Sequence, residues 1–259
     1  MEKLWKSTWT AFLLVALATA AAADTWYYWA DAHGEHFSHE RPRPGTMFTP
    51  VAVPDNRTWD RPPPMAPQIE AREPVSGQEL YRRVSVSVYW VRSRSRDPLA
   101  QRSVYGSAVA ISDTDALTNC HVALGGGDQL SIGSGKQDEE GEATLEAVDI
   151  VADRCVVRTR ELRLQPVGGV RPYDSLEIGE TIYAIGNPRK LERTLSNGLV
   201  SGKRDDAESR VVQFTAAISH GSSGGGLFDA HGNLVGITSY TIEDSQGLNF
   251  AIPAEDYWK

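Results

Sequence analysis

From residue 79 to residue 259, the sequence consists of short runs of β-branched and apolar residues separated by Gly, Asp and Asn. No convincing helical period interrupts these runs, and no segment repeats at a fixed period. Many short strands at such spacing are typical of an all-β barrel or sandwich, whereas a parallel sheet would need helices between its strands. We therefore predict one all-β domain over residues 79–259. Its expected strands lie in VSVSVYWV, SVYGSAVAIS, TLEAVDIVA, CVVRT, ETIYAIG, TLSNGLVSG, RVVQFTA, NLVGITSY and GLNFAI.

Three stretches of different composition precede this domain. Residues 1–23 begin with two lysines, continue with a short apolar run and end in small residues, which is the layout of a secretory signal peptide. Because this run is shorter than the stretch of about 20 residues that spans a membrane, we expect export with cleavage and no membrane span afterwards. Residues 24–54 predict a small β unit with a hairpin turn at residues 31–34. Residues 55–78 are rich in proline and predict an extended linker.

The composition limits the partners of the chain. The net charge is −8, and removal of residues 1–23, which contain Glu2, Lys3 and Lys6, leaves −9. An acidic chain is a poor partner for nucleic acid or for an anionic membrane surface. Only two cysteines are present, so the chain cannot form a cysteine-rich scaffold or a cysteine-based zinc site. We expect no nucleic-acid partner, no metal and no cofactor.

The stretch HGSSGGGLFDAHGNLVGI, residues 220–237, contains six glycines around two adjacent serines. A flexible linker would not be followed at once by apolar strands, and a phosphate-binding loop would need a lysine and a helix. A nucleophile elbow of the G-x-S-x-G type would need a following helix, with Asp and His later in the chain. Only 36 residues follow Ser223, without a helical pattern. The remaining interpretation is a turn that presents a nucleophilic serine whose base lies upstream, in the order His, Asp, Ser.

Six sequence blocks in one order support this interpretation. His121 stands in LTNCHV, after the end of an apolar strand, and Asp153 stands in DRCVVR, at the head of a β-branched run. Together with YGSAVAIS, GETIYAIGNPRKLERTLSNGLVSG, AAISHGSSGGGLFDAHGNLVGI and LNFAIP, they cover about residues 83–253. This region resembles a trypsin-like serine protease and most resembles the bacterial HtrA-type branch. The resemblance implies two antiparallel six-stranded β-barrels of the chymotrypsin-like kind and a serine endopeptidase that acts on polypeptides.

The resemblance also implies a role for each site residue. Ser223 would be the nucleophile, His121 the general base, and Asp153 the group that orients His121 and stabilises its cation. The backbone N–H groups of Gly221 and Ser223 would form the oxyanion hole. Asp149 is a second candidate for the role of Asp153. An alternative remains open, in which the chain is a catalytically silent binding or scaffold module of the cell envelope with the same fold.

Two further expectations follow from these assignments. In trypsin-like relatives, the base of the primary specificity pocket lies six residues before the nucleophile, which is Ala217 here, and Thr238 and Ser239 lie on the wall strand. Because no acid stands at that base, we expect cleavage after small or medium apolar residues. Cys120 precedes His121, and Cys155 lies two residues after Asp153, so forming the His–Asp pair brings the cysteines together. In an exported chain we expect them to form a disulfide.

The ends of the chain suggest where it acts. Residues 27–45, YYWADAHGEHFSHERPRPG, resemble a short β domain that follows signal peptides in many bacterial envelope proteins. We expect this unit to be a spacer or an adaptor for an envelope partner, and the mature protein to be periplasmic or extracellular. The sequence stops soon after LNFAIP, so we expect no PDZ domain of the kind that many HtrA-type proteins carry.

Overall fold

The computed structural model describes residues 25–31, 34–38, 42–46, 49–52, 73–96, 102–135, 139–205, 210–242 and 246–259. The predicted signal peptide, residues 53–54 of the predicted β unit and residues 55–72 of the predicted linker lie outside the described residues. In the part of the chain that is described, no helix is both long enough and apolar enough to cross a membrane.

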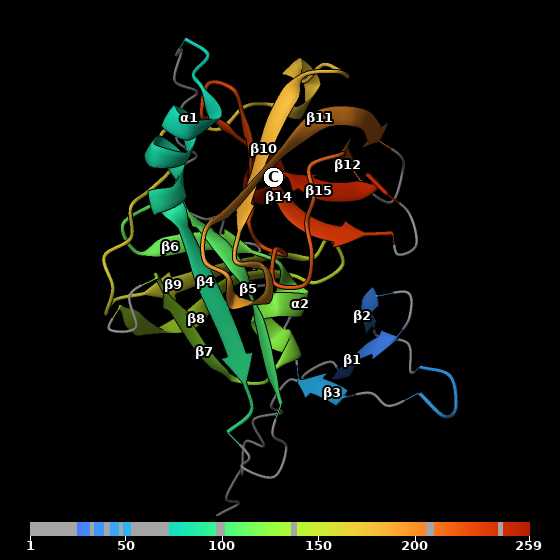
Figure 1. Ribbon diagram of the computed structural model, residues 1–259. Coiled ribbons are helices and arrows are strands. Elements are labelled where there is room, and N and C mark those ends of the chain that lie inside the picture. The colour runs from blue at the N-terminus through green and yellow to red at the C-terminus, as the bar shows by residue number, and fades with distance from the viewer. Residues whose placement is uncertain are drawn as a thin grey trace, which may run out of the picture.

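Six antiparallel strands form a first closed barrel, in the order β4-β5-β6-β9-β8-β7 (Figure 1). This barrel carries the sequence blocks around His121 and Asp153. Its strands are β4 (Val88–Arg94), β5 (Ser103–Ala110), β6 (Asp115–Thr118), β7 (Gln129–Gly133), β8 (Glu140–Asp149) and β9 (Arg154–Thr159).

Six more antiparallel strands form a second closed barrel, in the order β10-β11-β12-β15-β14-β13. The glycine-rich turn around Ser223 joins two distant parts of this barrel, since it follows β12 and precedes β13. The prediction of two six-stranded barrels is confirmed. The strands are β10 (Thr181–Gly186), β11 (Thr194–Asp205), β12 (Arg210–Phe214), β13 (Gly226–Asp229), β14 (Leu234–Thr241) and β15 (Asn249–Pro253).

Three apolar clusters explain why these segments form two barrels. One fills the first barrel, with side chains such as Val91 and Ile132, and one fills the second, with side chains such as Ile182 and Phe214. The third cluster takes Val109 from the first barrel and Ile185 and Phe228 from the second, together with Leu80 and Tyr257 from segments outside the barrels. Successive side chains of a strand point to opposite faces, so one strand can place side chains both inside its own barrel and between the two barrels. The seam between the barrels is therefore a packed core, and the site is built along it.

Two short helices were not expected from the sequence. Helix α1 (Gly77–Val84) is capped by Ser76, whose side chain accepts a hydrogen bond from the Glu79 N–H, and it buries Leu80 and Val84 in the interface cluster. Helix α2 (Cys120–Gly125) is buried along its whole length, so it has no polar face to produce a helical pattern. The predicted domain boundary at Glu79 falls inside α1. The 3-10 helices are η2 (Ser85–Ser87), η3 (Tyr173–Ser175), η4 (Pro188–Lys190) and η5 (Ala254–Trp258).

The N-terminal β unit is a three-stranded antiparallel sheet in the order β2-β1-β3. Strands β1 (Thr25–Asp31) and β2 (Gly34–Ser38) form the expected hairpin, and β3 (Thr49–Ala52) pairs with the other edge of β1. The sheet lies outside both barrels, with β2 against α2 (Figure 1). It therefore contacts the helix that carries His121.

Candidate active site

His121 and Asp153 are hydrogen bonded across the first barrel. The His121 Nδ1 atom lies 2.8 Å from Asp153 Oδ2, and the His121 backbone N–H donates to Asp153 Oδ1 at 3.0 Å. A carboxylate next to Nδ1 favours the proton on that nitrogen and leaves Nε2 as the basic atom. The two contacts fix both the tautomer and the orientation of the ring.

Asp153 has a left-handed backbone, with φ of 53°. Asp adopts this conformation more readily than most residues, and it still needs support from its surroundings. The Asp153 N–H donates to the Ile150 carbonyl at 3.1 Å, and the Asp153 carbonyl accepts from the Cys120 N–H at 3.4 Å and from Asn119 Nδ2 at 3.2 Å. The segment that enters α2 therefore donates hydrogen bonds to both the backbone carbonyl and the carboxylate of Asp153.

A disulfide joins the same two segments. Cys120 and Cys155 are bonded, with their Cα atoms 4.9 Å apart, and Cys155 pairs with Thr118 across β6 and β9. The predicted disulfide is present. It links the first residue of α2 to the strand that follows Asp153, so the two sides of the His121–Asp153 pair are covalently connected.

Asp149, the second candidate for the orienting role, has other partners. Its carboxylate forms an ion pair with Arg154 and accepts a hydrogen bond from the Ala152 N–H at 3.1 Å. The Arg154 guanidinium also donates to the Asp256 carbonyl. Asp149 thus holds Arg154 against the C-terminal turn, while the described carboxylate contacts of His121 are made by Asp153.

Ser239 connects the second barrel to this pair, which the sequence did not indicate. Its hydroxyl donates to Asp153 Oδ2 at 3.0 Å, and its backbone carbonyl accepts from the Ser223 hydroxyl at 2.8 Å. Ser239 was predicted to lie on the wall of the specificity pocket. It lies on β14, the predicted wall strand, buried between Ser223 and Asp153, and no motif in the sequence distinguishes it from its neighbours.

Two glycines give the serine turn its shape. Gly221 has φ of 93° and Gly224 has φ of 85°, which favours glycine at both positions. A Cβ atom on Gly221 would lie 2.7 Å from the Asn187 carbonyl oxygen, and one on Gly224 would lie 1.9 Å from the Ser107 carbonyl oxygen. The turn therefore requires glycine for its backbone angle and for its close packing.

Several carbonyl groups of this turn accept hydrogen bonds from other parts of the protein. Ser107 binds two of them, because its hydroxyl donates to the Gly221 carbonyl at 2.8 Å and its N–H donates to the Ser223 carbonyl at 2.7 Å. The His220 carbonyl accepts from the Arg189 N–H at 2.8 Å. The peptide planes of the turn are thereby held in one orientation.

The N–H groups of Gly221 and Ser223 lie next to the Ser223 hydroxyl and differ from their neighbours in the turn. Those of Ser222, Gly224 and Gly225 each donate to a backbone carbonyl at 2.8 Å. Among the residues that the structure describes, none accepts a hydrogen bond from the N–H of Gly221 or Ser223. A pair of N–H donors beside a serine hydroxyl is the arrangement that binds a negatively charged oxygen.

Comparison with known proteins places this geometry in a family. The family model of the trypsin-like peptidase domain matches residues 106–237, about half of the chain, and this span includes His121, Asp153 and Ser223. The chain belongs to the trypsin-like peptidase family. Its relatives are of the HtrA type. The serine protease Do-like HtrA of Bacillus subtilis is 34% identical over 154 residues, which cover 54% of this chain and 34% of that protein.

Other relatives match a larger share of this chain. The serine endoprotease DegS of Salmonella typhimurium is 29% identical over 209 residues, or 74% of this chain and 58% of its own length. Among solved structures, the HtrA-type protease AlgW with tripeptide has a TM-score of 0.62 and 30% identity, covering 71% of this chain and 61% of that chain. The chain thus spans only part of the length of each of these relatives.

A cavity of about 260 Å³ lies next to the turn that carries Ser223. The predicted pocket residues Ala217 and Thr238 line it together with Ser222, the neighbour of Ser223, whereas Ser239 is not part of its lining. No charged side chain is among its described lining residues. A cation entering this cavity would find no partner there.

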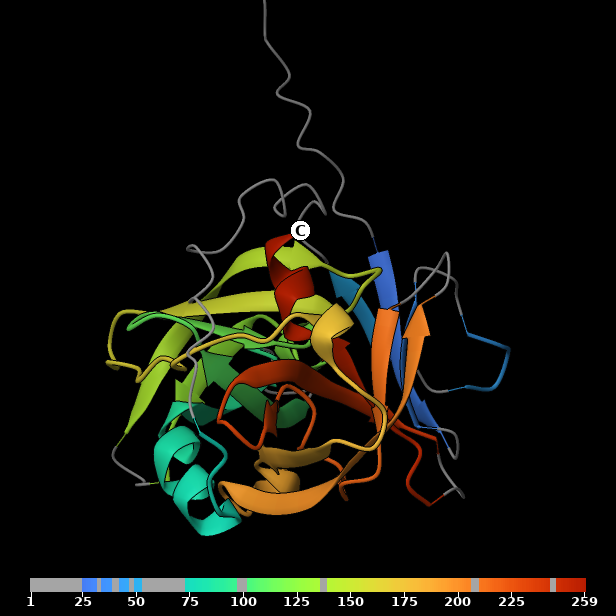
Figure 2. The ribbon, with the colours of Figure 1, turned by 90° about the horizontal axis from the view of Figure 1, so that it is seen from above.

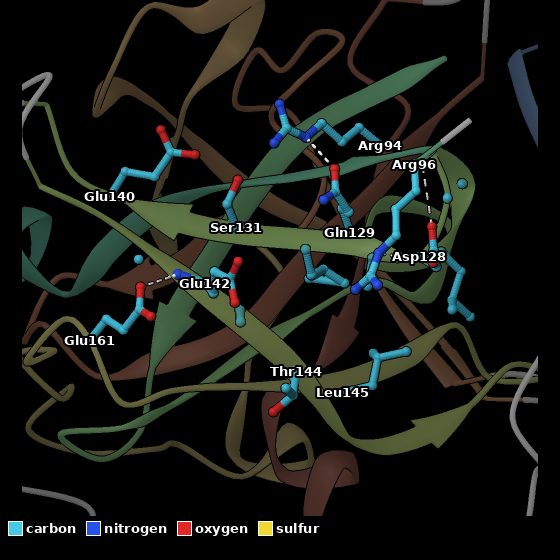
Figure 3. A pocket seen from close by; sticks show the side chains of 17 residues that line it. Arg94, Arg96, Asp128, Gln129, Ser131, Glu140, Glu142, Thr144, Leu145 and Glu161 are labelled. Carbon is cyan, nitrogen blue, oxygen red and sulfur yellow. Dashed lines mark hydrogen bonds and ion pairs between the residues drawn. The ribbon is translucent and has the colours of Figure 1, made fainter. Parts of the chain in front are cut away.

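A second cavity, with a volume of about 560 Å³, lies on the first barrel beside β7 and β8. Its charged rim is largely paired: Arg94 Nε donates to Gln129 Oε1 at 2.8 Å, and Arg96 forms an ion pair with Asp128 at 3.2 Å (Figure 3). None of the residues predicted for the active site lines it. The larger of these two cavities is therefore not the one at the serine turn.

The C-terminal turn supports the His121 corner from behind. The hydroxyl of Tyr257, which is fully buried in η5, donates to the Thr118 carbonyl at 3.0 Å. Thr118 ends β6, three residues before His121, and Figure 2 shows η5 in red beside the green and yellow strands of the first barrel. Burial, together with the nearby charge of Asp153, raises the pKa of Tyr257 well above its usual range, so the hydroxyl keeps its proton.

Proposed function

We propose that the protein is a serine endopeptidase that hydrolyses peptide bonds through Ser223, His121 and Asp153 and an acyl-enzyme intermediate. The observation that carries the proposal is the connected set of hydrogen bonds from Ser223 through Ser239 and Asp153 to His121. This set joins a nucleophile, a base and an orienting carboxylate that come from two different barrels. The names of the HtrA-type relatives agree with this activity.

The reaction begins with a rotation of the Ser223 side chain. In the structure its hydroxyl donates to the Ser239 carbonyl, so it must turn to donate to His121 Nε2 before it can lose its proton. His121 then accepts the proton while Ser223 Oγ attacks the carbonyl carbon of the substrate. Asp153, bonded to His121 Nδ1, stabilises the imidazolium that forms.

The N–H groups of Gly221 and Ser223 receive the charge that develops on the substrate oxygen. Both lack a described acceptor, so they are available without breaking a bond inside the protein. Such a donor lowers the barrier by roughly 3 to 4 kcal/mol. His121 next donates its proton to the leaving amine, and a water molecule, activated by His121, hydrolyses the acyl-enzyme.

We propose cleavage after small or medium apolar residues. The cavity next to Ser222 supports this specificity, since Ala217 and Thr238 line it and no charged side chain is among its described lining residues. A buried Arg or Lys of a substrate would lose its hydration there without gaining a partner. A cleavage profile dominated by Arg and Lys would contradict this specificity.

We also propose that the protein is exported and acts in the periplasm or outside the cell. The basic, apolar and small-residue order of residues 1–23 supports this, and so does the Cys120–Cys155 disulfide, because such bonds persist in oxidising compartments. The N-terminal sheet would serve as a spacer or adaptor toward a partner in the envelope.

One observation favours a second candidate function, a binding module with a silent site. The Ser223 hydroxyl is already bonded to the Ser239 carbonyl, and a serine that stays there would not react. A fluorophosphonate probe distinguishes the two, because it labels only an activated serine. We expect labelling of the wild-type protein, no labelling of Ser223→Ala or His121→Ala, and normal labelling of His231→Ala as a matched control. Equal labelling of Ser223→Ala would reject the assignment of the nucleophile, and a folded but unlabelled wild type would favour the silent module.

A further inference from the structure

The loop between β10 and β11 concentrates positive charge beside the serine turn. Residues 188–193 read PRKLER, with three cations and one acid, in a chain whose net charge is −8. Arg189 and Lys190 are exposed, and neither forms an ion pair with any carboxylate of the described residues. Many other arginines of the two barrels are neutralised in ion pairs, among them Arg92, Arg158, Arg171 and Arg210.

The backbone of this loop is directly attached to the oxyanion turn. The Arg189 N–H donates to the His220 carbonyl at 2.8 Å, and a Cβ atom on Gly221 would lie 3.1 Å from the Arg189 nitrogen. Arg189, Lys190 and Arg193 all have left-handed backbones, with φ of 51°, 65° and 49°. Three such residues without a glycine form an unusual conformation, and the contacts with the turn hold it in place.

Lys190 is fixed by an aromatic platform on the first barrel. Its Nζ lies 5.8 Å from the centre of the Tyr105 ring, and Tyr105 stacks on Trp90 with 5.9 Å between the ring centres. Tyr105 is followed by Gly106, where an added Cβ atom would lie 2.9 Å from the Ser223 carbonyl oxygen. The ammonium group of Lys190 therefore lies next to the strand segment that touches the nucleophile.

Ser223 is held between two sides of the molecule, and the Lys190 ammonium group lies on one of them. On one side, the Ser239 carbonyl of β14 accepts a hydrogen bond from the Ser223 hydroxyl. On the other, the Ser107 N–H of β5 donates to the Ser223 carbonyl. The proposed function assigns the substrate residue before the scissile bond to Thr238 on the β14 side. Pro188 and Thr194, at the two ends of the loop, line the same cavity, whereas the Lys190 ammonium group lies over Tyr105 of β5. A substrate segment that continues past Ser223 away from the cavity therefore runs toward β5 and Lys190.

One acid in the loop does not cancel this charge. The Glu192 carboxylate lies against Gly135 of the first barrel and close enough to Tyr105, the ring under Lys190, for its charge to add to burial in raising the pKa of Tyr105. With Arg189, Lys190 and Arg193 counted against Glu192, residues 188–193 keep two positive charges. An exposed cation without a partner attracts an anionic side chain of a ligand at close range.

We infer that Arg189 and Lys190 select substrates with acidic residues directly after the scissile bond. The inference rests on the proposed function and names the substrate class of the same site. Because the Arg189 N–H and not its side chain holds His220, replacing the side chain leaves the bond to the oxyanion turn in place. The side-chain charge can therefore be tested separately from the turn.

The test uses quenched fluorescent peptides of one sequence with alanine before the scissile bond and Asp, Gln or Lys at the two positions after it. We expect kcat/KM of the wild type to be roughly three- to tenfold higher for Asp than for Gln, the range of two exposed ion pairs. In about 1 M salt, where the screening length falls to about 3 Å, the ratio should approach one. The double variant Arg189→Gln/Lys190→Gln should lose the preference, and Arg189→Glu/Lys190→Glu should prefer Lys.

The matched control is Arg160→Gln/Arg163→Gln, which removes two exposed cations from the first barrel with the same change in net charge and should keep the wild-type ratio. Cleavage without an acidic preference, or a preference that survives in the Arg189→Gln/Lys190→Gln variant, overturns the inference and leaves the proposed function standing. Labelling of Ser223 by the fluorophosphonate probe without cleavage of the acidic peptides also overturns it. If the probe did not label Ser223 and no peptide were cleaved, the proposed function would be rejected, and the inference with it.

Discussion

The two barrels hold their parts of the site by different means. In the first barrel, His121 and Asp153 are joined by side-chain hydrogen bonds, and a disulfide closes the same corner. In the second barrel, the turn around Ser223 is held by hydrogen bonds to its main chain and by glycines in left-handed conformations. The base is thus fixed by the chemistry of particular side chains, and the nucleophile by the path of the backbone. Activity in the first barrel should therefore be most sensitive to side-chain substitutions, and activity in the second barrel to changes of the backbone conformation.

The largest effect is expected at the carboxylate of the first barrel. Asp153→Asn should lower kcat by roughly 10⁴-fold, because an amide does not hold His121 in the tautomer that leaves Nε2 basic. Peptide hydrolysis measured on a folded, titrated enzyme checks this.

The matched variant is Asp149→Asn, which breaks the ion pair with Arg154 but leaves the contacts of His121 with Asp153. Its kcat should stay within about tenfold of the wild type, the scale of a single perturbed hydrogen bond. The reverse ranking of the two variants would assign the orienting role to Asp149.

The next largest effect is expected in the backbone of the serine turn. Gly221→Ala should lower kcat by roughly 10²- to 10³-fold, since a Cβ atom 2.7 Å from the Asn187 carbonyl oxygen must displace the N–H that receives the oxyanion. Gly179→Ala is the matched control, because Gly179 also has a positive φ, of 98°, but no atom within 4 Å of an added Cβ. It should lose stability and keep its activity. If both variants lost the same activity, backbone strain alone would explain the effect.

A third variant separates stability from chemistry in the first barrel. Removal of the disulfide by Cys120→Ala/Cys155→Ala should lower the free energy of unfolding by at most about 4 kcal/mol, the loop-closure value for residues 35 apart in sequence. The hydrogen bonds between His121 and Asp153 remain, so kcat should fall far less than in Asp153→Asn. Denaturant unfolding with and without a reducing agent checks this, because only the wild type should respond to reduction. A wild type whose stability does not change on reduction would contradict the prediction.

Most of the barrel architecture could be predicted from the sequence, and the helices could not. Short β-branched runs bounded by Gly, Asp and Asn identify strands because alternation and turn chemistry are local properties. Helix α2 is buried on every side, so its residues show no helical period. Helix α1 has only two buried residues, Leu80 and Val84, too few to stand out from the strand pattern next to it.

The candidate site divides in the same way. The residues His121, Asp153 and Ser223 could be named from ordered motifs. The sequence ranks Asp153 ahead of Asp149 but does not exclude Asp149, because the ion pair of Asp149 with Arg154 is a property of the fold. Nor could it show that Ser239 links the barrels, since that contact depends on where two distant strands meet. The free N–H groups of the turn are also a property of the backbone path and not of residue identity.

The smallest effect is expected at Tyr257, which supports the first barrel from the C-terminal turn. Tyr257→Phe removes the hydroxyl that donates to the buried Thr118 carbonyl, so the free energy of unfolding should fall by about 1 to 2 kcal/mol. The strand end before His121 should loosen, and kcat should fall about threefold, the rate equivalent of roughly 0.6 kcal/mol. The matched variant is Tyr173→Phe in the second barrel, whose buried hydroxyl donates to the Arg204 carbonyl at 3.0 Å.

Tyr173→Phe should lose similar stability and no kcat, because Tyr173 does not contact the segments that carry His121 or Ser223. The dependence of stability on pH in alkaline solution gives a second measurement. The pKa of Tyr257 is raised in the folded protein by burial, so its contribution to stability is present below the ordinary tyrosine pKa of about 10 and is lost as the pH rises through the folded value. The stability difference between the wild type and Tyr257→Phe should therefore narrow above about pH 10. A difference that stays constant there would mean that folding does not raise the pKa of Tyr257, and a variant as stable as the wild type at neutral pH would mean that the hydrogen bond to Thr118 contributes nothing.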